Sequence, residues 1–413
     1  MIDERIVWLL AYTVGNPLCP GFSSGDILFS FHDRYTLRFV LAAAIVGSGK
    51  TAARRSFSSP ESASNGSEQD TMGTLFRAAT LTNYFEVAEH LGLNPQPLLA
   101  AAGLTRAQLQ DPEQHIPATA AIELLEDSAR ASACITFGLR MAESRELADF
   151  GAVSLLLAHQ RTLRDALKAV VRYDHLLNEA LAISVEDAGA TVILREEIVT
   201  QPPVQSRQGI ELAIGVLFRL CAALLGSAWR PLSVNFTHDA PTDLAIHKRL
   251  FRCKLYFGAE FNGIVCPAHS LDRLSPTADA ALADYAERFL ASLPDKSEHS
   301  VVMDARKSIF LLLPVGRAGI DQVAQALGMN VRTLQRRLEE SGTVFSELVN
   351  EVRRELVLRY MANTRYSLGR VAELLGYSAP GSFTRWFTAQ FGCAPARWRA
   401  DHLRRPDRPP GEG

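Results

Sequence analysis

The fold of the C-terminal part of the chain is indicated by two similar six-residue stretches, Val323-Ala324-Gln325-Ala326-Leu327-Gly328 and Val371-Ala372-Glu373-Leu374-Leu375-Gly376. They are offset by 48 residues and share the pattern Val-Ala-polar-apolar-Leu-Gly. Each stretch continues a short amphipathic segment and closes on a glycine, the residue that most easily adopts a left-handed conformation at a helix end. The repeat therefore indicates two copies of one helical unit.

A second helix is expected after each of these glycines, over Arg332–Glu340 and Ser382–Gln390. Leu334 and Leu338 lie on one face of the first, and two phenylalanines take the same positions in the second. The leucine-to-phenylalanine offset is 49 residues, so the second turn is expected to be one residue longer. The sequence thus predicts two successive units, each made of two helices joined by a tight turn.

An amphipathic helix is expected over Phe345–Met361, where it would fix the distance between the two units. Two recognition helices at a fixed distance can enter successive major grooves about 34 Å apart on one face of DNA. With the leucines of the first recognition helix facing inward, Arg332, Gln335 and Arg336 face outward. Arginine can bind guanine and glutamine can bind adenine through paired hydrogen bonds, so these three side chains are the predicted base readers.

The charge is divided in a way that supports this prediction. The 413 residues carry a net charge of only −2, but residues 301–413 hold 17 Lys and Arg against 11 Asp and Glu, a net of +6, which leaves −8 for the rest. The alternative is a helical bundle with solvated arginines; the repeat and the local positive charge argue against it. Five further arginines are predicted to contact phosphates: Arg337, Arg353, Arg354, Arg370 and Arg397.

Residues 301–403 resemble the DNA-binding domain of the AraC/XylS family of transcriptional regulators. The residues that carry the resemblance are Gly376-Tyr377, Ser382-Phe383, Arg385, Phe387, Phe391-Gly392, Pro395 and Trp398-Arg399. The resemblance implies a seven-helix module with two helix-turn-helix units joined by a long helix. Its base-reading positions fall on Arg332, Gln335, Arg336, Pro380, Gly381, Ser382 and Arg385.

The second unit departs from the family pattern at three positions. Ala379 stands where a polar or acidic residue is common, Gly381 where a serine is usual, and Ala394 where Ser or Thr is usual. Pro380 has no backbone donor, and its neighbours have almost no side chain. We therefore expect the second helix to recognise bases more weakly than the first and to depend more on phosphates and DNA shape.

Residues 83–274 resemble the arabinose-binding-type effector domain of a subgroup that includes regulators of amino-acid catabolism and virulence. The matching residues include Phe150-Gly151, Thr162-Leu163, Arg172-Tyr173, Val234-Phe236-His238, Leu250-Phe251-Arg252-Cys253 and Phe257-Gly258. Hydrophobic periodicity predicts a mixed α+β domain. The expected helices are Ala118–Ser132, Thr162–Tyr173, Gln208–Leu225 and Thr277–Leu293, and the expected strands are Leu181–Val185, Thr191–Ile198, Leu232–Phe236 and Leu255–Phe257.

Arg172, Tyr173 and His175 are the candidate residues for an effector pocket, because an arginine can pair with an anionic effector. The alternative is an ordinary helix end with solvated charges.

Other kinds of site are disfavoured. Cys266 and His269 have a Cys-x-x-His spacing, but a proline follows the cysteine and no second close pair exists, so no metal or cofactor is expected. Gly47–Thr51 has the sequence GSGKT, but Ala44 stands where a phosphate-binding loop needs glycine. No catalytic motif is found, no apolar run reaches membrane length, and the six scattered cysteines are typical of a reducing compartment.

The sequence thus predicts an α+β effector-binding domain followed by an all-α DNA-binding domain with two helix-turn-helix units. The expected boundaries are an extension without fold over 1–71, an effector and dimerisation domain over 72–293, a linker over 294–300, a DNA-binding domain over 301–405, and a tail over 406–413. The expected function is a cytoplasmic bacterial transcription regulator, an activator, whose partners are promoter DNA, a small-molecule effector, RNA polymerase and a second copy of the chain, with no membrane. The alternative is a constitutive DNA-binding protein whose N-terminal half only oligomerises.

Overall fold

The computed structural model describes residues 74–204, 206–293 and 300–403. The expected extension over residues 1–71, with its GSGKT stretch, the linker up to residue 299, and the tail over 406–413 lie outside the described residues.

Residues 74–293 form an α+β domain, as the sequence predicts. Its strands are β1 (Leu75–Arg77), β2 (His115–Pro117), β3 (Leu181–Ala188), β4 (Thr191–Ile198), β5 (Ser233–Phe236), β6 (Lys254–Phe257) and β7 (Gly263–Pro267). Its helices are η1 (Ala78–Leu81), α2 (Tyr84–His90), α3 (Pro95–Ala101), α4 (Ala118–Ala131), α5 (Phe137–Glu143), η2 (Leu147–Phe150), α6 (Val153–His159), α7 (Leu163–Arg172), η3 (Asp174–Leu176), α8 (Arg207–Leu225), α9 (Ala245–Phe251), α10 (Ala268–Leu271) and α11 (Ala280–Ser292).

The main sheet has the strand order β3-β4-β7-β5-β6. All neighbours are antiparallel except β5 and β6, and β1 pairs with β2 in a separate two-stranded sheet. The central strand β7 is not among the expected strands, and neither are β1 and β2. The alternate residues Ile264 and Cys266 of β7 are fully buried, so its place in the sheet comes from packing that sequence-local patterns do not reveal.

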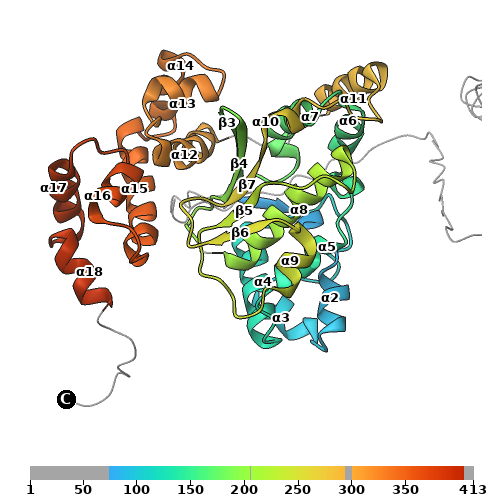
Figure 1. The fold of residues 1–413 in the computed structure, drawn as a ribbon, viewed down its shortest axis with the longest axis horizontal. Helices are drawn as coiled ribbons and strands as arrows, with labels where there is room; N and C mark the ends of the chain where they lie inside the picture. Colours follow the sequence, from blue (N-terminus) through green and yellow to red (C-terminus); the bar gives the residue numbers. More distant parts are fainter. Residues whose placement is uncertain (1–73, 205, 294–299, 404–413) are drawn as a thin grey trace, which may run out of the picture. The chain divides into compact units, whose positions relative to one another are not determined.

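Helix α8 packs against β4 and β7 and forms the centre of this domain (Figure 1). Two glycines allow α5 to approach it closely: a Cβ on Gly215 would lie 2.5 Å from the Cβ of Ala142, and a Cβ on Gly138 would lie 2.1 Å from the carbonyl oxygen of Gln208. Among the described residues, α8 is the one helix long and apolar enough to span a bilayer, and 72% of its most apolar 18-residue window is buried inside the protein.

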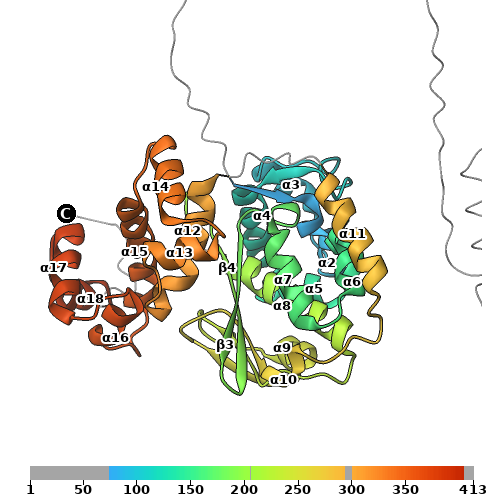
Figure 2. The same ribbon diagram turned by 90° about the horizontal axis from the view of Figure 1, so that it is seen from above.

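Residues 301–403 form a helical domain with seven α-helices among the described residues, which confirms the expected architecture. They are α12 (Val301–Leu312), α13 (Ile320–Ala326), α14 (Val331–Glu340), α15 (Phe345–Ala362), α16 (Leu368–Leu374), α17 (Pro380–Phe391) and α18 (Pro395–Leu403), with a 3₁₀ turn, η4 (Leu313–Val315), after the first. Helices α12, α13 and α14 pack together at one end of α15, and α16, α17 and α18 pack at the other (Figure 2).

The two helix-turn-helix units are α13 with α14 and α16 with α17. Gly328 and Gly376 have φ angles of 63° and 74°, so both take the left-handed conformation that the repeat predicts. The first helices end 48 residues apart and the second helices begin 49 residues apart, so the second turn is one residue longer, as expected. Helix α17 begins two residues before the predicted Ser382, because Pro380 suits the first helical position, where no backbone donor is needed.

Candidate DNA-binding helices and effector cavity

The predicted base-reading residues of the first unit are exposed on α14. The Asn330 side chain caps this helix by accepting a hydrogen bond from the Thr333 amide at 2.8 Å. Leu334 is fully buried, whereas Arg332, Gln335 and Arg336 are all exposed on the other side. The helix therefore offers guanidinium and amide groups outward from a face whose orientation is fixed by packing.

The second recognition helix, α17, presents a smaller polar surface. Pro380, Gly381 and Arg385 are exposed, and Ser382 is half-buried with its hydroxyl 3.4 Å from the Arg385 guanidinium. Two exposed threonines that the sequence argument did not select, Thr384 and Thr388, share this helix with Arg385. A helical-wheel projection from residue 380 would have found them.

The five predicted phosphate contacts have different environments. Arg337 is exposed on α14 and forms no ion pair with any described residue. Arg353 donates to the Leu375 carbonyl and lies over the Tyr377 ring, 4.5 Å from its centroid, so it holds α15 to the turn of the second unit. Arg354 donates to Gln390, and Arg397 lies 3.7 Å from Asp401.

Arg370 is bound by two carboxylates. Its guanidinium donates two hydrogen bonds of 2.7 Å to Glu260, which follows β6, and one of 2.8 Å to Glu373. A predicted phosphate contact is therefore occupied by an acidic residue of the α+β domain.

The α+β domain contains a cavity of about 110 Å³ that is partly open to solvent. Most of its wall is apolar and comes from η2, α7, β3, β4 and α8, with residues such as Phe150, Val170, Ile183, Leu212 and Leu217. Its polar lining consists of Arg77, Thr80, Arg145, Asp149, Asn178 and Glu196.

The three residues predicted for an effector pocket do not line this cavity. Arg172 forms an ion pair with Glu287 on the surface, and Tyr173 is buried in the core with its ring 6.2 Å from that of His175. Their neighbours in sequence, Val170, Leu177 and Asn178, line the cavity instead. The predicted segment thus borders the cavity, but its charged residues point elsewhere.

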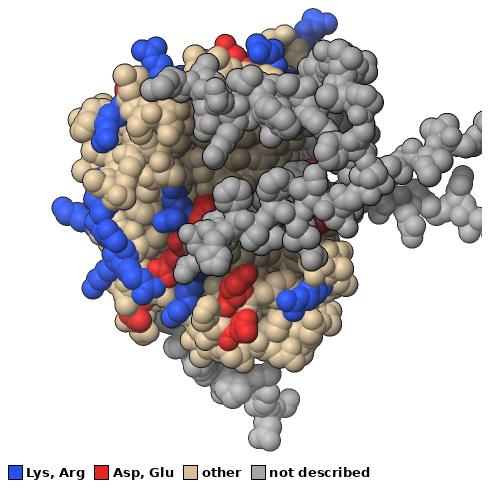
Figure 3. Space-filling model, turned by 90° about the vertical axis from the view of Figure 1, so that its right-hand side faces the viewer, with Lys and Arg blue, Asp and Glu red and all other residues tan. Residues whose placement is uncertain are grey.

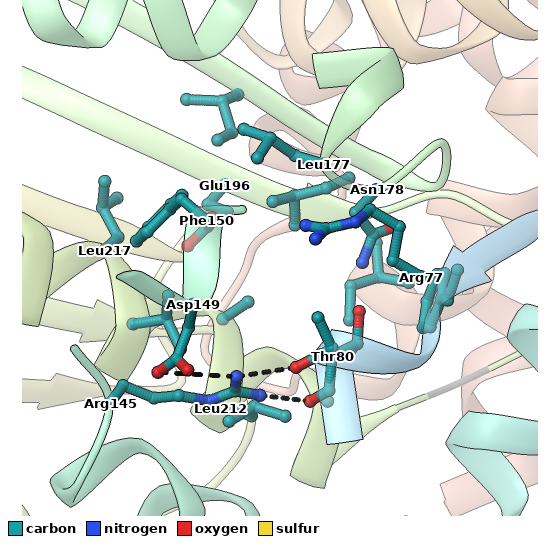
Figure 4. A pocket seen from close by; sticks show the side chains of 18 of the residues that line it. Arg77, Thr80, Arg145, Asp149, Phe150, Leu177, Asn178, Glu196, Leu212 and Leu217 are labelled. Atoms are coloured by element: carbon teal, nitrogen blue, oxygen red, sulfur yellow. Dashed lines mark hydrogen bonds and ion pairs between the residues drawn. The ribbon is translucent and has the colours of Figure 1, made fainter. Parts of the chain in front are cut away.

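Most charged groups of the cavity wall have partners. Arg145 donates to the carbonyls of Ala79 and Thr80 and lies 3.9 Å from Asp149 (Figure 4). Burial lowers the pKa of Arg145 to about 10, which leaves it charged at neutral pH. Arg77 forms a two-point ion pair with Glu113.

Glu196 differs from these groups. It is 2% exposed, and its Oε2 is buried with no hydrogen-bond partner among the described residues. Burial, with a further contribution from the charge of Glu197, raises the pKa of Glu196 to about 8. A buried carboxyl group without a partner is costly, which is typical of a site that binds something.

The next residue along β4 faces the DNA-binding domain. Glu197 accepts hydrogen bonds of 3.0 and 3.2 Å from the Arg359 guanidinium of α15. Ala182 of β3 and Val199, which follows β4, share one hydrophobic core with α12 and α15. A second ionic contact joins Lys307 of α12 to Asp174 at 2.7 Å.

The free cysteines of the α+β domain include the half-buried Cys253 and the buried Cys266, the latter from the Cys-x-x-His spacing. Cys266 donates to the Val192 carbonyl, and His247 is fully buried against Glu211. Burial raises the pKa of the Cys253 thiol to about 11 and that of the Cys266 thiol to about 12, so both thiols keep their protons at neutral pH.

Surface charges of the α+β domain are largely paired. Arg164 binds Asp272 and Arg249 binds Glu143. On the face drawn in Figure 3, acidic and basic side chains are interspersed among uncharged ones. On α14, Arg332 and Arg337 are exposed and have no ion-pair partner among the described residues.

Comparison with known proteins agrees with this architecture. Residues 92–274 match the arabinose-binding domain of AraC transcription regulators, and residues 323–401 match a helix-turn-helix domain. The HTH-type transcriptional regulator VirS of Mycobacterium tuberculosis is 30% identical over 335 residues, which cover 80% of this chain and 97% of VirS. The chain belongs to the AraC family of transcriptional regulators. This AraC-family protein is thus a DNA-binding transcriptional regulator and not an enzyme.

Other relatives of this AraC-family regulator are more distant or shorter matches. The ornithine utilization regulator of Pseudomonas aeruginosa is 22% identical over 317 residues, which cover 76% of this chain and 92% of that protein. The transcriptional activator NphR of Rhodococcus is 31% identical over 85 residues, which cover 21% of this chain and 25% of NphR.

Proposed function

We propose that a small-molecule effector bound in the cavity of the α+β domain controls how this regulator binds or activates a promoter. One observation carries the proposal: Glu196 and Glu197 are adjacent on β4, one facing the cavity and the other bound to Arg359 of the DNA-binding domain. Successive side chains of a strand point to opposite faces, so a shift of β4 caused by a ligand also moves the partner of Arg359.

The position of Arg359 makes such a shift relevant to DNA. Arg359 lies on α15, the helix that separates the two helix-turn-helix units. Two recognition helices must reach major grooves about 34 Å apart, so a small change at α15 alters how both fit one stretch of DNA. Control of this kind requires that the effector bind the two arrangements with different affinity.

A second contact lies between the cavity and α12. Asp174, which binds Lys307, belongs to η3, and this turn leads directly into Leu177 and Asn178 of the cavity wall. Two separate contacts from the cavity wall to the DNA-binding domain support coupling more strongly than one.

The remaining parts of the proposal concern partners. We infer that the regulator acts in the bacterial cytoplasm as an activator that contacts RNA polymerase; the similarity of 85 of its residues to a protein named as an activator, NphR, supports this. Dimer formation is supported by Leu282, Tyr285 and Phe289, large apolar residues exposed on α11.

The test uses the substitution Ala213→Leu, which fills part of the cavity from α8 and mimics a bound ligand. We expect the affinity for a promoter fragment, measured by fluorescence anisotropy, to change severalfold. Ala223→Leu, at an exposed position of the same helix, is the matched control and leaves the affinity unchanged.

The substitution Glu197→Gln then tests whether the effect of the cavity on DNA binding depends on the contact between Glu197 and Arg359. In that background the effect of Ala213→Leu on DNA affinity is expected to disappear, because the contact with Arg359 is weakened. If neither Ala213→Leu nor Glu197→Gln changes the DNA affinity, the result favours the alternative of a constitutive DNA-binding protein.

A further inference from the structure

The cavity has a polar group that is ready to bind a ligand. Glu196 lies in a wall that is otherwise largely apolar, beside Phe150 and across the open space from Arg77 and Asn178 (Figure 4). Its register partner on β3 is Ile183, and the next cavity-facing residue of β4 is Ile198, so its neighbours in the sheet offer it no hydrogen bond. A ligand that enters this space meets a carboxyl group without a partner.

The other charges that face the cavity are already balanced. Arg77 of β1 is paired with Glu113, and Arg145, which follows α5, binds two carbonyls and lies near Asp149 of η2. Asp149 also accepts from the Glu146 amide at 2.9 Å. From α8 the wall contributes mainly apolar residues.

We propose that the effector is a mainly apolar molecule with one protonated amine, whose ammonium group binds the Glu196 carboxylate. The inference rests on the proposed function for the cavity as the effector site. The apolar walls take the body of the ligand, and the ammonium supplies the charge-assisted hydrogen bonds that Glu196 lacks.

Two other ligand classes fit less well. An anionic head group would lie near the Glu196 carboxyl group, and the guanidinium groups of Arg77 and Arg145 already have partners. A neutral alcohol can share a hydrogen bond with Glu196 but supplies no charge for the carboxylate, so it gains less from this site.

The proposal has a pH signature with a defined sign. In the free protein Glu196 has a pKa raised to about 8 by burial and by the charge of Glu197, so it is mostly protonated at neutral pH. An ammonium ion binds the ionised form and therefore displaces one proton. Amine affinity should rise nearly tenfold per pH unit below about pH 7 and level off above about pH 8, because alkyl ammonium groups stay protonated throughout that range.

The experiment measures binding of hexylamine, 1-hexanol and hexanoate to the full-length protein by calorimetry at several pH values. We expect hexylamine to bind best, and Glu196→Gln to weaken it roughly tenfold or more while the affinity for hexanol changes little. Glu123→Gln, at an exposed site on α4, is the matched control and leaves all three affinities unchanged. Ala213→Leu should weaken all three probes.

Glutamine has the shape of glutamate and carries no charge, so Glu196→Gln is expected to fold, and the pH profile of the unaltered protein provides a second measurement. The inference is overturned if hexylamine fails to bind, binds no better than hexanol, keeps its affinity in Glu196→Gln, or shows no rise with pH. DNA affinity is measured separately with and without hexylamine. Amine binding without any change in DNA affinity would overturn the proposed function and leave the ligand class standing.

Discussion

Arg336 lies on the exposed face of α14, with its guanidinium 3.8 Å from the Glu340 carboxylate and two-thirds of its side chain open to solvent. An exposed ion pair of this kind is weak, so the guanidinium is free to turn toward DNA. Leu334 and Leu338, both fully buried, fix the direction in which it points. The base-reading assignment for Arg336 therefore remains a prediction with a specific geometry behind it.

We expect Arg336→Ala to reduce affinity for the preferred site by about 1–3 kcal/mol and to relax specificity at one base pair. Binding to a panel of single-base variants of the site measures both effects. Arg130→Ala, an exposed arginine of α4 far along the chain from the recognition helices, is the control. An equal loss on every sequence would instead make Arg336 a phosphate contact.

The two helix-turn-helix units differ in how the glycines of their turns are packed. Both glycines have positive φ angles, but a Cβ on Gly376 would lie 3.2 Å from Cδ1 of Leu313, whereas a Cβ on Gly328 would meet nothing within 4 Å. The second turn thus has a steric constraint in addition to its backbone conformation.

Gly328→Ala is therefore expected to lower the free energy of unfolding by about 1–2 kcal/mol, the cost of a left-handed backbone for alanine. Gly376→Ala should lower the free energy of unfolding by a larger amount, because the Leu313 side chain must also move. Urea unfolding followed by tryptophan fluorescence measures the two values, since Trp386 and Trp398 both pack in this domain. Equal losses would mean that the backbone conformation alone sets the cost.

Glu260 of the α+β domain binds the guanidinium of Arg370, which is also a predicted contact for DNA phosphate. Glu260 holds two nitrogens of Arg370 at 2.7 Å, and phosphate oxygens would need the same donors. Glu260 would therefore compete with DNA phosphates for the guanidinium group of Arg370.

Glu260→Gln should accordingly raise DNA affinity in the absence of effector, by up to about fivefold, because exposed ion pairs contribute about 0.2–1 kcal/mol. The gain should shrink as salt rises and screens the interaction. Glu143→Gln breaks a similar exposed pair, with Arg249, and is the control. Affinity unchanged by Glu260→Gln at low salt would rule out this competition.

The fold was largely predictable wherever local patterns carry it. The repeated Val-Ala-x-x-Leu-Gly stretches predicted both turns, and the expected strands Leu181–Val185 and Thr191–Ile198 are present as β3 and β4, with β3 extended to Ala188. The short strand β7 escaped prediction because its burial depends on β4 and β5, which lie far from it in the sequence. The expected domain boundaries stay predictions.

The two helical units, their spacing and the outward face of α14 follow from the amino-acid sequence, because helix periodicity and glycine turns depend on residues close together in the chain. The position of the cavity and the residues that line it depend instead on how distant segments of the chain pack together. Glu196 and Glu197 are the same residue type at adjacent positions of β4. The pleat of the strand places the Glu196 side chain in the largely apolar cavity and the Glu197 side chain against Arg359. Their different roles arise because burial and partners come from segments far apart in the chain.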